Sequence, residues 1–192
     1  DWDVQTYTKR IAWKESLYMR YLTSGNAVMT YFPSQSLLDA YEDKEHDLRY
    51  RYHFVEDAAE VMFWSSYSYP AYVFFSMSHV LSGPTTAEMY LIKAEALGAV
   101  NGLATLKEFM NKRYATVLLP SNMTDIEFQN QILDERHREL YAEGQRWYDL
   151  KRTNRLDLFS SLNGRNYLMY YPVPQSERDL AGEENYPQNE GY

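Results

Sequence analysis

The stretch ILDERHRELYAEGQRWYDLKR, from Ile132 to Arg152, sets three glutamates four residues apart, at Glu135, Glu139 and Glu143. Residues four apart lie on one face of a helix, so these carboxylates would form a single stripe of like charge. Like charges at that spacing repel each other and destabilise the helix. The stripe therefore needs a counterpart, which a catalytic task, a metal ion or a set of arginines could supply.

Arginines are interleaved with the glutamates: Arg136, Arg138 and Arg146 each lie within about one helical turn of a glutamate. A nearby positive charge lowers the pKa of a carboxyl group, whereas a glycosidase needs one carboxyl group whose pKa is raised. The pattern therefore favours a structural ion-pair network that keeps the glutamates ionised. It predicts a protein that is not an enzyme.

The sequence contains no clear pattern for a metal, a cofactor or an activated nucleophile. The four histidines (His46, His53, His79 and His137) are scattered, and only Asp134 and His137 have a helical i, i+3 spacing. A solvated helix face explains one such pair, because metal sites built on helices repeat their ligand pattern. There is no cysteine, no glycine-rich phosphate loop and no Gly-x-Ser-x-Gly turn, so we expect neither a metal nor a cofactor.

Charge and hydropathy argue against two further classes of partner. The 192 residues include 19 lysines and arginines against 27 acidic residues, a net charge of -8, and the basic residues do not cluster. This balance opposes binding to nucleic acid. No apolar run is long enough to span a bilayer, and the first residues lack the zones of a signal peptide. Since the sequence starts at Asp1 and not at Met, we expect a processed or truncated start.

Two capping patterns predict two helical hairpins between residues 83 and 158. Thr85 and Glu88 form a capping box that opens one helix, and Thr124 and Glu127 form a second box. The first helix would end at a turn over Asn101–Gly102. The expected apolar stripes are Met89, Ile92, Ala96 and Val100 before this turn, and Leu103, Leu106 and Met110 after it. Two hairpins in series are typical of a helical-repeat solenoid.

The two ends of the chain have a different character from the helical middle. Residues 1–82 are expected to be loop-rich with short strands. Polar and aromatic residues alternate from Arg49 to Val55, which predicts a half-buried strand, and Tyr72 to Ser78 could pair with it. Residues 159–192 are rich in Pro, Asn and Gly, which predicts a tail of one short strand followed by coil.

Aromatic residues are more abundant than a core of this size needs, with 19 tyrosines and four tryptophans. Both side chains present a flat apolar face with a polar tip, which suits stacking on a ligand. Serines and Pro70 in the connection between the two β-prone runs argue against its continuous burial. The predicted ligand-contacting residues are Trp64, Tyr67, Tyr69 and Tyr72, with Trp13 and Tyr31 as weaker candidates. The alternative is that these rings cap the hydrophobic core.

Three motifs together resemble the SusD/RagB family, the nutrient-binding lipoproteins of the Bacteroidetes outer membrane. ILDERHRELYAEGQRWYDLKR resembles the family's signature helix pair, AEMYLIKAEAL the hairpin before it, and YYPVPQSERDL with the closing QNEGY its proline-rich carboxyl end. SLLDAYEDKEHDLRY is similar to a further stretch in which Asp47 and Arg49 form an Asp-x-Arg pair. By this resemblance, the framework residues of an ion-pair network are Glu135, Arg136, Glu139, Glu143, Arg146, Asp149 and Arg152.

The resemblance implies a mainly α fold: a TPR-like alpha-alpha superhelix with a loop-rich region and a short β-hairpin. Residues 1–192 would be the carboxyl-terminal region of a lipid-anchored cell-surface protein, with further helical pairs in an amino-terminal portion of the same protein. The implied function is to bind a glycan or other nutrient oligomer without catalysis and to deliver it to a SusC-like TonB-dependent transporter. A peptide-binding family member and a helical-repeat scaffold for protein interactions remain open as alternatives.

Overall fold

The computed structural model describes residues 29–57, 60, 68–74, 84–141, 143–159, 162, 164–182 and 184–191. The chain forms two compact units, Asp1–Gln145 and Arg146–Tyr192. The predicted ligand residues Trp13, Trp64 and Tyr67 lie outside the described residues, as do residues 75–78 of the second β-prone run. The predicted division of the chain near residues 82 and 158 stays a prediction.

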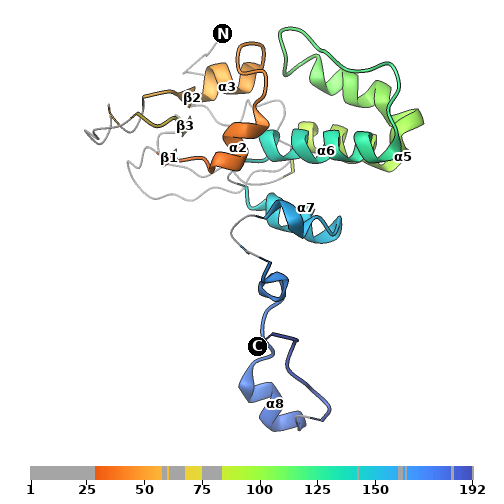
Figure 1. Cartoon of the computed structure of the whole chain (residues 1–192). Helices are drawn as coiled ribbons and strands as arrows, with labels where there is room; N and C mark the ends of the chain where they lie inside the picture. The colour runs from red at the N-terminus through yellow and green to blue at the C-terminus, as the bar shows by residue number, and fades with distance from the viewer. Residues whose placement is uncertain are drawn as a thin grey trace. The chain divides into compact units, whose positions relative to one another are not determined.

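Within the described residues, three short strands form one antiparallel sheet in the order β1-β3-β2 (Figure 1). They are β1 (Met29–Tyr31), β2 (Phe54–Val55) and β3 (Ala71–Phe74). Phe54 pairs with Tyr72, so the predicted pairing between the two β-prone runs is confirmed. The other edge of β3 pairs with β1, where Tyr31 lies opposite Tyr72.

The strand predicted to begin at Arg49 is wrong for most of its length, because Leu48–His53 form helix α3. Asp47 is the N-cap of this helix, and its carboxylate accepts a 2.9 Å hydrogen bond from the backbone N–H of Arg49. Such a cap stabilises a helix start by about 0.5–2 kcal/mol, whereas the β preference of aromatic residues depends on their packing. The rings therefore do not share one face: Tyr50 is buried, and Tyr52 is exposed.

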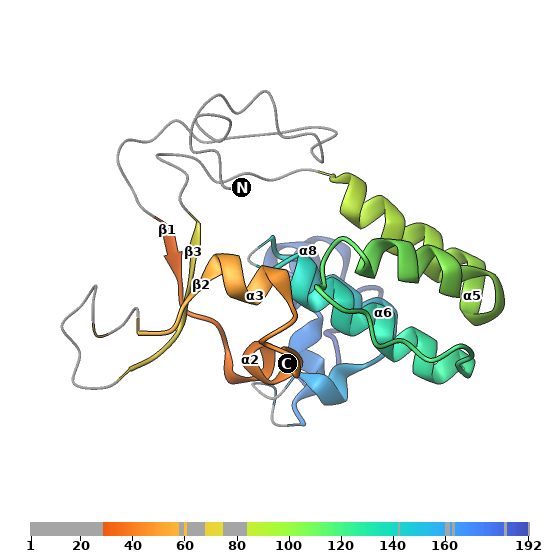
Figure 2. The same cartoon turned by 90° about the horizontal axis from the view of Figure 1, so that it is seen from above.

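Helix α5 (Thr86–Met110) turns back on itself at Gly98. The backbone there has φ 70° and ψ 177°, a conformation that glycine adopts without a steric penalty. The two halves lie against each other (Figure 2), since a Cβ atom added to Gly102 would be 2.2 Å from the carbonyl oxygen of Ala94. The predicted helical hairpin is present, but the turn predicted at Asn101–Gly102 is wrong. Gly102 lies inside the second half, where its lack of a side chain lets the two backbones meet.

Helix α6 (Asp125–Glu139) begins with the predicted capping box. The hydroxyl of Thr124 accepts a 3.3 Å hydrogen bond from the N–H of Glu127, whose carboxylate accepts a 2.8 Å bond from the N–H of Thr124. At the start of α5, the hydroxyl of Thr85 accepts a 3.2 Å bond from the N–H of Glu88. Both predicted helix starts are confirmed.

The first hydrophobic core is formed by α5 and α6. Its buried residues are Ala87, Leu91, Ala94, Ala99, Leu106, Phe109, Met110, Phe128 and Ile132. The apolar stripe predicted for the first half of α5 has the wrong phase, because Met89, Ile92 and Val100 are exposed. Small residues such as Ala94 face the core instead, since they let the helices approach closely. The side chains of Met89, Ile92 and Val100 therefore lie on the side of α5 that faces away from the core.

A second core joins α2 (Gln35–Ala40) to α3 and β2. Its buried residues are Leu37, Leu38, Tyr41, Tyr50 and Phe54. The rings of Tyr50 and Phe54 stack with 4.7 Å between their centroids. The hydroxyl of Tyr41 donates a 3.1 Å hydrogen bond to the carbonyl oxygen of Arg138 on α6. Part of the aromatic surplus near the sheet is therefore core and not ligand surface.

The second unit is built from short elements. They are α7 (Gln145–Arg152), the 3-10 helices η1 (Leu156–Leu158) and η3 (Asn166–Met169), and α8 (Gln175–Ala181). Leu150, Leu162 and Met169 are buried in this unit. The described residues of the tail contain no strand, so the short strand predicted there is wrong. Instead of a neighbouring strand, the side chain of Gln188 forms hydrogen bonds with the backbone of Val173.

Candidate functional site

Arg49 lies at the centre of a buried group of charges in the first unit. Its guanidinium donates hydrogen bonds to Asp47 (2.8 and 3.0 Å), Glu135 (2.9 Å), Glu139 (3.2 Å) and the hydroxyl of Tyr114 (2.9 Å). Burial lowers the pKa of a cation, but the carboxylates of Glu135 and Asp47 outweigh burial and hold the pKa of Arg49 above its usual value. The Arg49 network consists of Asp47, Arg49, Arg113, Tyr114, Glu135, Arg138 and Glu139.

Glu135, on α6, has no exposed surface. Its carboxylate accepts hydrogen bonds from Arg49 (2.9 Å), from Arg138 (2.7 Å) and from the hydroxyl of Tyr114 (2.8 Å). Burial raises the pKa of this carboxyl group, but Arg49 and Arg138 outweigh burial and hold the pKa below its usual value. An ionised carboxylate has no proton to donate, so Glu135 is not suited to act as a general acid.

Glu139 joins the network to the loop that follows α5. Its two oxygens accept hydrogen bonds of 2.8, 2.9 and 3.0 Å from the guanidinium of Arg113. Backbone bonds link this loop in turn to the start of α3, since the N–H of Leu48 donates to the carbonyl of Arg113 and the N–H of Ala115 to the carbonyl of His46. These contacts fasten the start of α3, which runs directly into β2, to α6.

The other predicted network residues lie elsewhere. The guanidinium of Arg136 is 3.6 Å from the carboxylate of Glu88 on α5. In the second unit, Asp149 and Arg152 form a 2.9 Å pair within α7. Arg146 also lies in α7, and its pairing with the glutamates of α6 stays a prediction.

Glu143 differs from the other two glutamates of the stripe. Burial, together with the nearby carboxylates of Glu88 and Glu139, raises the pKa of Glu143 to about 7. The expectation that arginines hold all three glutamates in their ionised form is therefore wrong for Glu143. A raised pKa is found in catalytic carboxyl groups and also where like charges are crowded. For Glu143 burial is the larger cause, and the two neighbouring carboxylates of Glu88 and Glu139 add to it.

Of the predicted ligand residues, Tyr69 is the one whose side chain lies in the described part of the structure. Its hydroxyl donates a 2.8 Å hydrogen bond to the carbonyl of Pro33, and its ring lies 6.2 Å from that of Phe32 between centroids. Phe32 is 46% exposed, and Tyr69 is partly buried. Tyr72 is placed by its backbone in the central strand β3. The described part of the aromatic surface is thus a half-exposed pair of rings beside the sheet.

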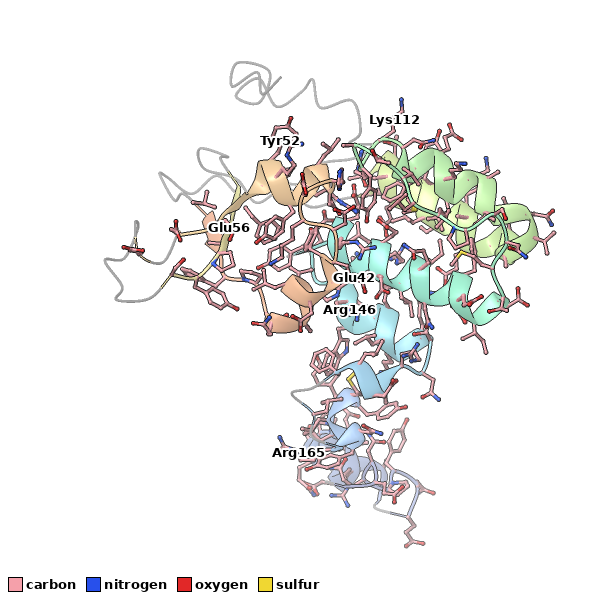
Figure 3. The ribbon with its side chains drawn as sticks, turned by 45° about the horizontal axis from the view of Figure 1, so that its top comes forward. Glu42, Tyr52, Glu56, Lys112, Arg146 and Arg165 are labelled. Atoms are coloured by element: carbon pink, nitrogen blue, oxygen red, sulfur yellow. The ribbon has the colours of Figure 1, made fainter. Side chains whose placement is uncertain are left out.

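Hydrogen bonds join the two ends of the connection between β2 and β3. The hydroxyl of Ser68 donates to the carboxylate of Asp57 and, at 3.4 Å, to the carbonyl of Glu56. The hydroxyl of Tyr50 donates a 2.8 Å hydrogen bond to the carboxylate of Glu56, which Figure 3 labels beside the strands. These hydrogen bonds therefore hold together the two ends of the connection that contains Trp64 and Tyr67 in the sequence.

Several residues of this region are not found by sequence reasoning. Tyr114 precedes Glu135 by 21 residues, and no local spacing relates the two. Phe32 lies between Tyr31 and Pro33 and belongs to no periodic pattern of aromatic residues. Tyr52, 58% exposed, projects from α3 (Figure 3), whereas alternation in the sequence would place it on the same side as buried Tyr50.

The described residues contain no group of three or more histidine, aspartate or glutamate side chains arranged to hold a metal ion. None of the helices in these ranges has the length and apolar character needed to cross a membrane. The features that the described residues do show are the ion pairs that hold the framework and the aromatic rings beside the sheet.

Three comparisons with known proteins each match a SusD protein or the SusD family model. The sequence model of the SusD family matches residues 86–166. A SusD-like protein from Formosa agariphila is 37% identical over 90 residues, a match that covers 41% of this chain and 18% of that protein. A crystal structure of a SusD superfamily protein from Bacteroides vulgatus has a TM-score of 0.57 at 19% identity and covers 98% of this chain and 49% of that chain. The chain thus spans about half the length of that structure, and this likeness confirms the predicted mainly α, TPR-like fold.

Proposed function

Because the chain belongs to the SusD/RagB family, we propose that it is part of a cell-surface protein that binds a nutrient oligomer. The protein would deliver this ligand, chemically unchanged, to a SusC-like TonB-dependent transporter of the outer membrane. The ligand class that we propose is a glycan. The family match covers the framework helices and begins after the aromatic residues of the sheet, so the proposed binding site rests on the geometry of those residues.

The half-exposed ring pair of Phe32 and Tyr69 is the observation that carries this proposal. A pyranose has an apolar face and a rim of hydroxyl groups, and it stacks on an exposed aromatic ring. The hydrogen bond from Tyr69 to the carbonyl of Pro33 holds that ring in place, which reduces the entropy lost on binding. We propose that the remaining ligand contacts come from Tyr72 on β3 and from Trp64, Tyr67 and Trp13.

We propose binding without catalysis. Glycoside hydrolysis needs two carboxyl groups on opposite sides of the scissile bond, one of them protonated. Glu135 and Glu139 are each held by arginines, and the raised pKa of Glu143 comes from burial and from the nearby carboxylates of Glu88 and Glu139. We therefore propose that Glu135, Glu139 and Glu143 belong to the framework of the fold and take no part in catalysis.

An amino-terminal portion of the same protein is proposed to cover the outer face of α5. Met89 and Ile92 are exposed on this helix, and Val100 is 91% exposed, although the other side of the helix is packed in the core. Apolar faces of helical repeats are usually covered by a neighbouring pair of helices. The same portion would carry the lipid anchor that holds the protein at the outer membrane.

A screen of ligands tests the proposed function. The purified chain would be titrated calorimetrically with maltohexaose, cellohexaose and laminarihexaose, and separately with peptides of similar length. For a hexasaccharide that binds, Phe32→Ala should weaken the affinity by about tenfold, the effect of losing roughly 1.4 kcal/mol of contact. Tyr52→Ala removes an exposed ring on α3 and is the matched control.

The outcomes of this screen separate the candidate functions. Unchanged affinity in Phe32→Ala would show that the ring pair is not the site. Binding of peptides without any binding of glycans would favour the peptide-binding alternative. Binding of neither class would favour a helical scaffold that contacts other proteins.

A further inference from the structure

The segment Tyr170–Pro174 of the second unit, here called the tyrosine ridge, exposes two rings. Tyr170 is 51% and Tyr171 is 87% exposed. The backbone of Tyr170 is extended, with φ -113° and ψ 142°. Successive side chains of an extended backbone point to opposite sides, so the two rings lie on the two flanks of the ridge.

Side-chain amides from the end of the chain hold the backbone of the ridge. The N–H of Val173 donates to the amide oxygen of Gln188 at 2.8 Å, and the amide nitrogen of Gln188 donates to the carbonyl of Val173 at 3.2 Å. The amide of Asn189 donates a 2.6 Å hydrogen bond to the carbonyl of Tyr171. Gln188 thus takes the place of a neighbouring strand, and the ridge has its shape before any ligand binds.

The rings of Tyr170 and Tyr171 differ in how accessible their faces are to a ligand. The ammonium of Lys151 lies 4.7 Å from the centroid of the Tyr170 ring and donates a 3.2 Å hydrogen bond to the carbonyl of Met169. One face of Tyr170 is therefore occupied by a cation. Tyr171 is the more open ring, and it stands on a backbone that side chains hold in place.

The surroundings of these rings favour one class of ligand. Rings that anchor a protein partner lie within a patch of contacts that excludes water. The backbone beside Tyr171 is instead bordered by the amides of Gln188 and Asn189, and the chain that follows the ridge in the second unit exposes the acidic residues Glu177, Asp179, Glu184 and Glu190. An aromatic ring bordered by polar side chains matches the apolar face and the hydroxyl rim of a sugar. The negative charge of the acidic residues repels anionic sugars.

We propose that the tyrosine ridge is a second glycan-binding surface, at which a pyranose of a neutral oligosaccharide stacks on the ring of Tyr171. The ligand class rests on the proposed function, but the ridge belongs to the second unit and the Phe32–Tyr69 pair to the first. Because Gln188 and Asn189 hold the backbone in place, binding needs little further ordering of the chain. The ridge would bind an oligosaccharide independently of the Phe32–Tyr69 pair.

Hydroxyl-radical footprinting with mass spectrometry tests the ridge directly. The purified 192-residue protein would be oxidised with and without saturating maltohexaose, cellohexaose or laminarihexaose. We expect oxidation of Tyr171 to fall several-fold with at least one of them. Oxidation of Tyr148, an exposed tyrosine on α7 of the same unit, should not change. Tyr171→Ala should weaken hexasaccharide binding several-fold, whereas Tyr148→Ala should not.

The same experiment distinguishes this inference from the proposed function. Protection of Phe32 without protection of Tyr171 would overturn the ridge and leave the first site standing. Protection of Tyr171 without protection of Phe32 would support the ridge and overturn the first site. Protection of neither residue would overturn both. Protection of Tyr171 by a proline-rich peptide but by no hexasaccharide would show that the ridge binds protein and not glycan.

Discussion

Arg49 and Glu135 lie 86 residues apart in the sequence, and a 2.9 Å ion pair joins their side chains inside the first unit. Glu135 belongs to α6, within the segment that the SusD family model matches. Arg49 belongs to α3, which runs directly into β2 of the sheet. One buried pair therefore connects the framework helices to the strands beside the proposed binding surface.

Replacing Arg49 should destabilise the protein strongly. Arg49→Met leaves Glu135 and Asp47 buried without their common cation, and breaking a buried pair in this way costs about 3–5 kcal/mol. Arg155→Met is the matched control, because the pair of Arg155 with Asp157 is exposed and such pairs contribute about 0–1 kcal/mol. Urea unfolding of both variants measures the difference. Similar midpoints for the two variants would contradict a structural role for the Arg49 network.

Glu143 should make stability depend on pH near neutrality. Its pKa is about 7 in the folded protein, whereas the pKa of an unfolded glutamate is about 4.3. A raised folded pKa lowers the stability of the folded state as pH rises above the unfolded pKa, and the loss is complete above the folded pKa. Glu143→Gln should therefore raise the melting temperature at about pH 8 and have little effect near pH 4.5. Glu42→Gln, at an exposed glutamate, is the control. A gain that is equal at both pH values would refute this account of Glu143.

Gly102 should resist a substitution that stabilises most helices. Alanine is normally preferred to glycine inside a helix by about 1 kcal/mol. At Gly102 the added Cβ atom would lie 2.2 Å from the carbonyl oxygen of Ala94 and 2.9 Å from the ring of Phe128. Gly102→Ala should therefore cost about 1–3 kcal/mol, the usual effect of overpacking a core. Asn101→Ala, at the exposed neighbouring position, should be neutral or stabilising in the same thermal melts. A stabilised Gly102→Ala variant would show that the halves of α5 do not cross closely there.

Local chemistry explains which parts of the fold could be predicted from the sequence. The capping box of Thr124 and Glu127 depends on residues three apart, so its spacing alone predicts the start of α6. The turn inside α5 was harder to place, because Gly98 and Gly102 lie only four residues apart and both suit a turn. Gly98 forms the turn, while Gly102 is needed at a helix crossing that only tertiary packing reveals.

Long-range contacts explain what could not be predicted. The alternation after Asp47 suggests a strand, but the cap at Asp47 and the ion pairs of Arg49 with α6 stabilise a helix instead. Phe32 belongs to no periodic pattern in the sequence, and its pairing with Tyr69 appears only when β1 and β3 come together. The amide contacts of Gln188 with Val173 have no local signature either, since 15 residues separate them.

Binding without turnover is the central claim, and one measurement tests it most directly. The purified chain would be titrated with the hexasaccharide that binds most tightly, and the same mixture would then be incubated and analysed by mass spectrometry. The account predicts saturable binding that Phe32→Ala weakens, with the hexasaccharide recovered intact. Shorter oligosaccharides that form at a rate proportional to protein concentration, or the lack of saturable binding to any glycan, would contradict it.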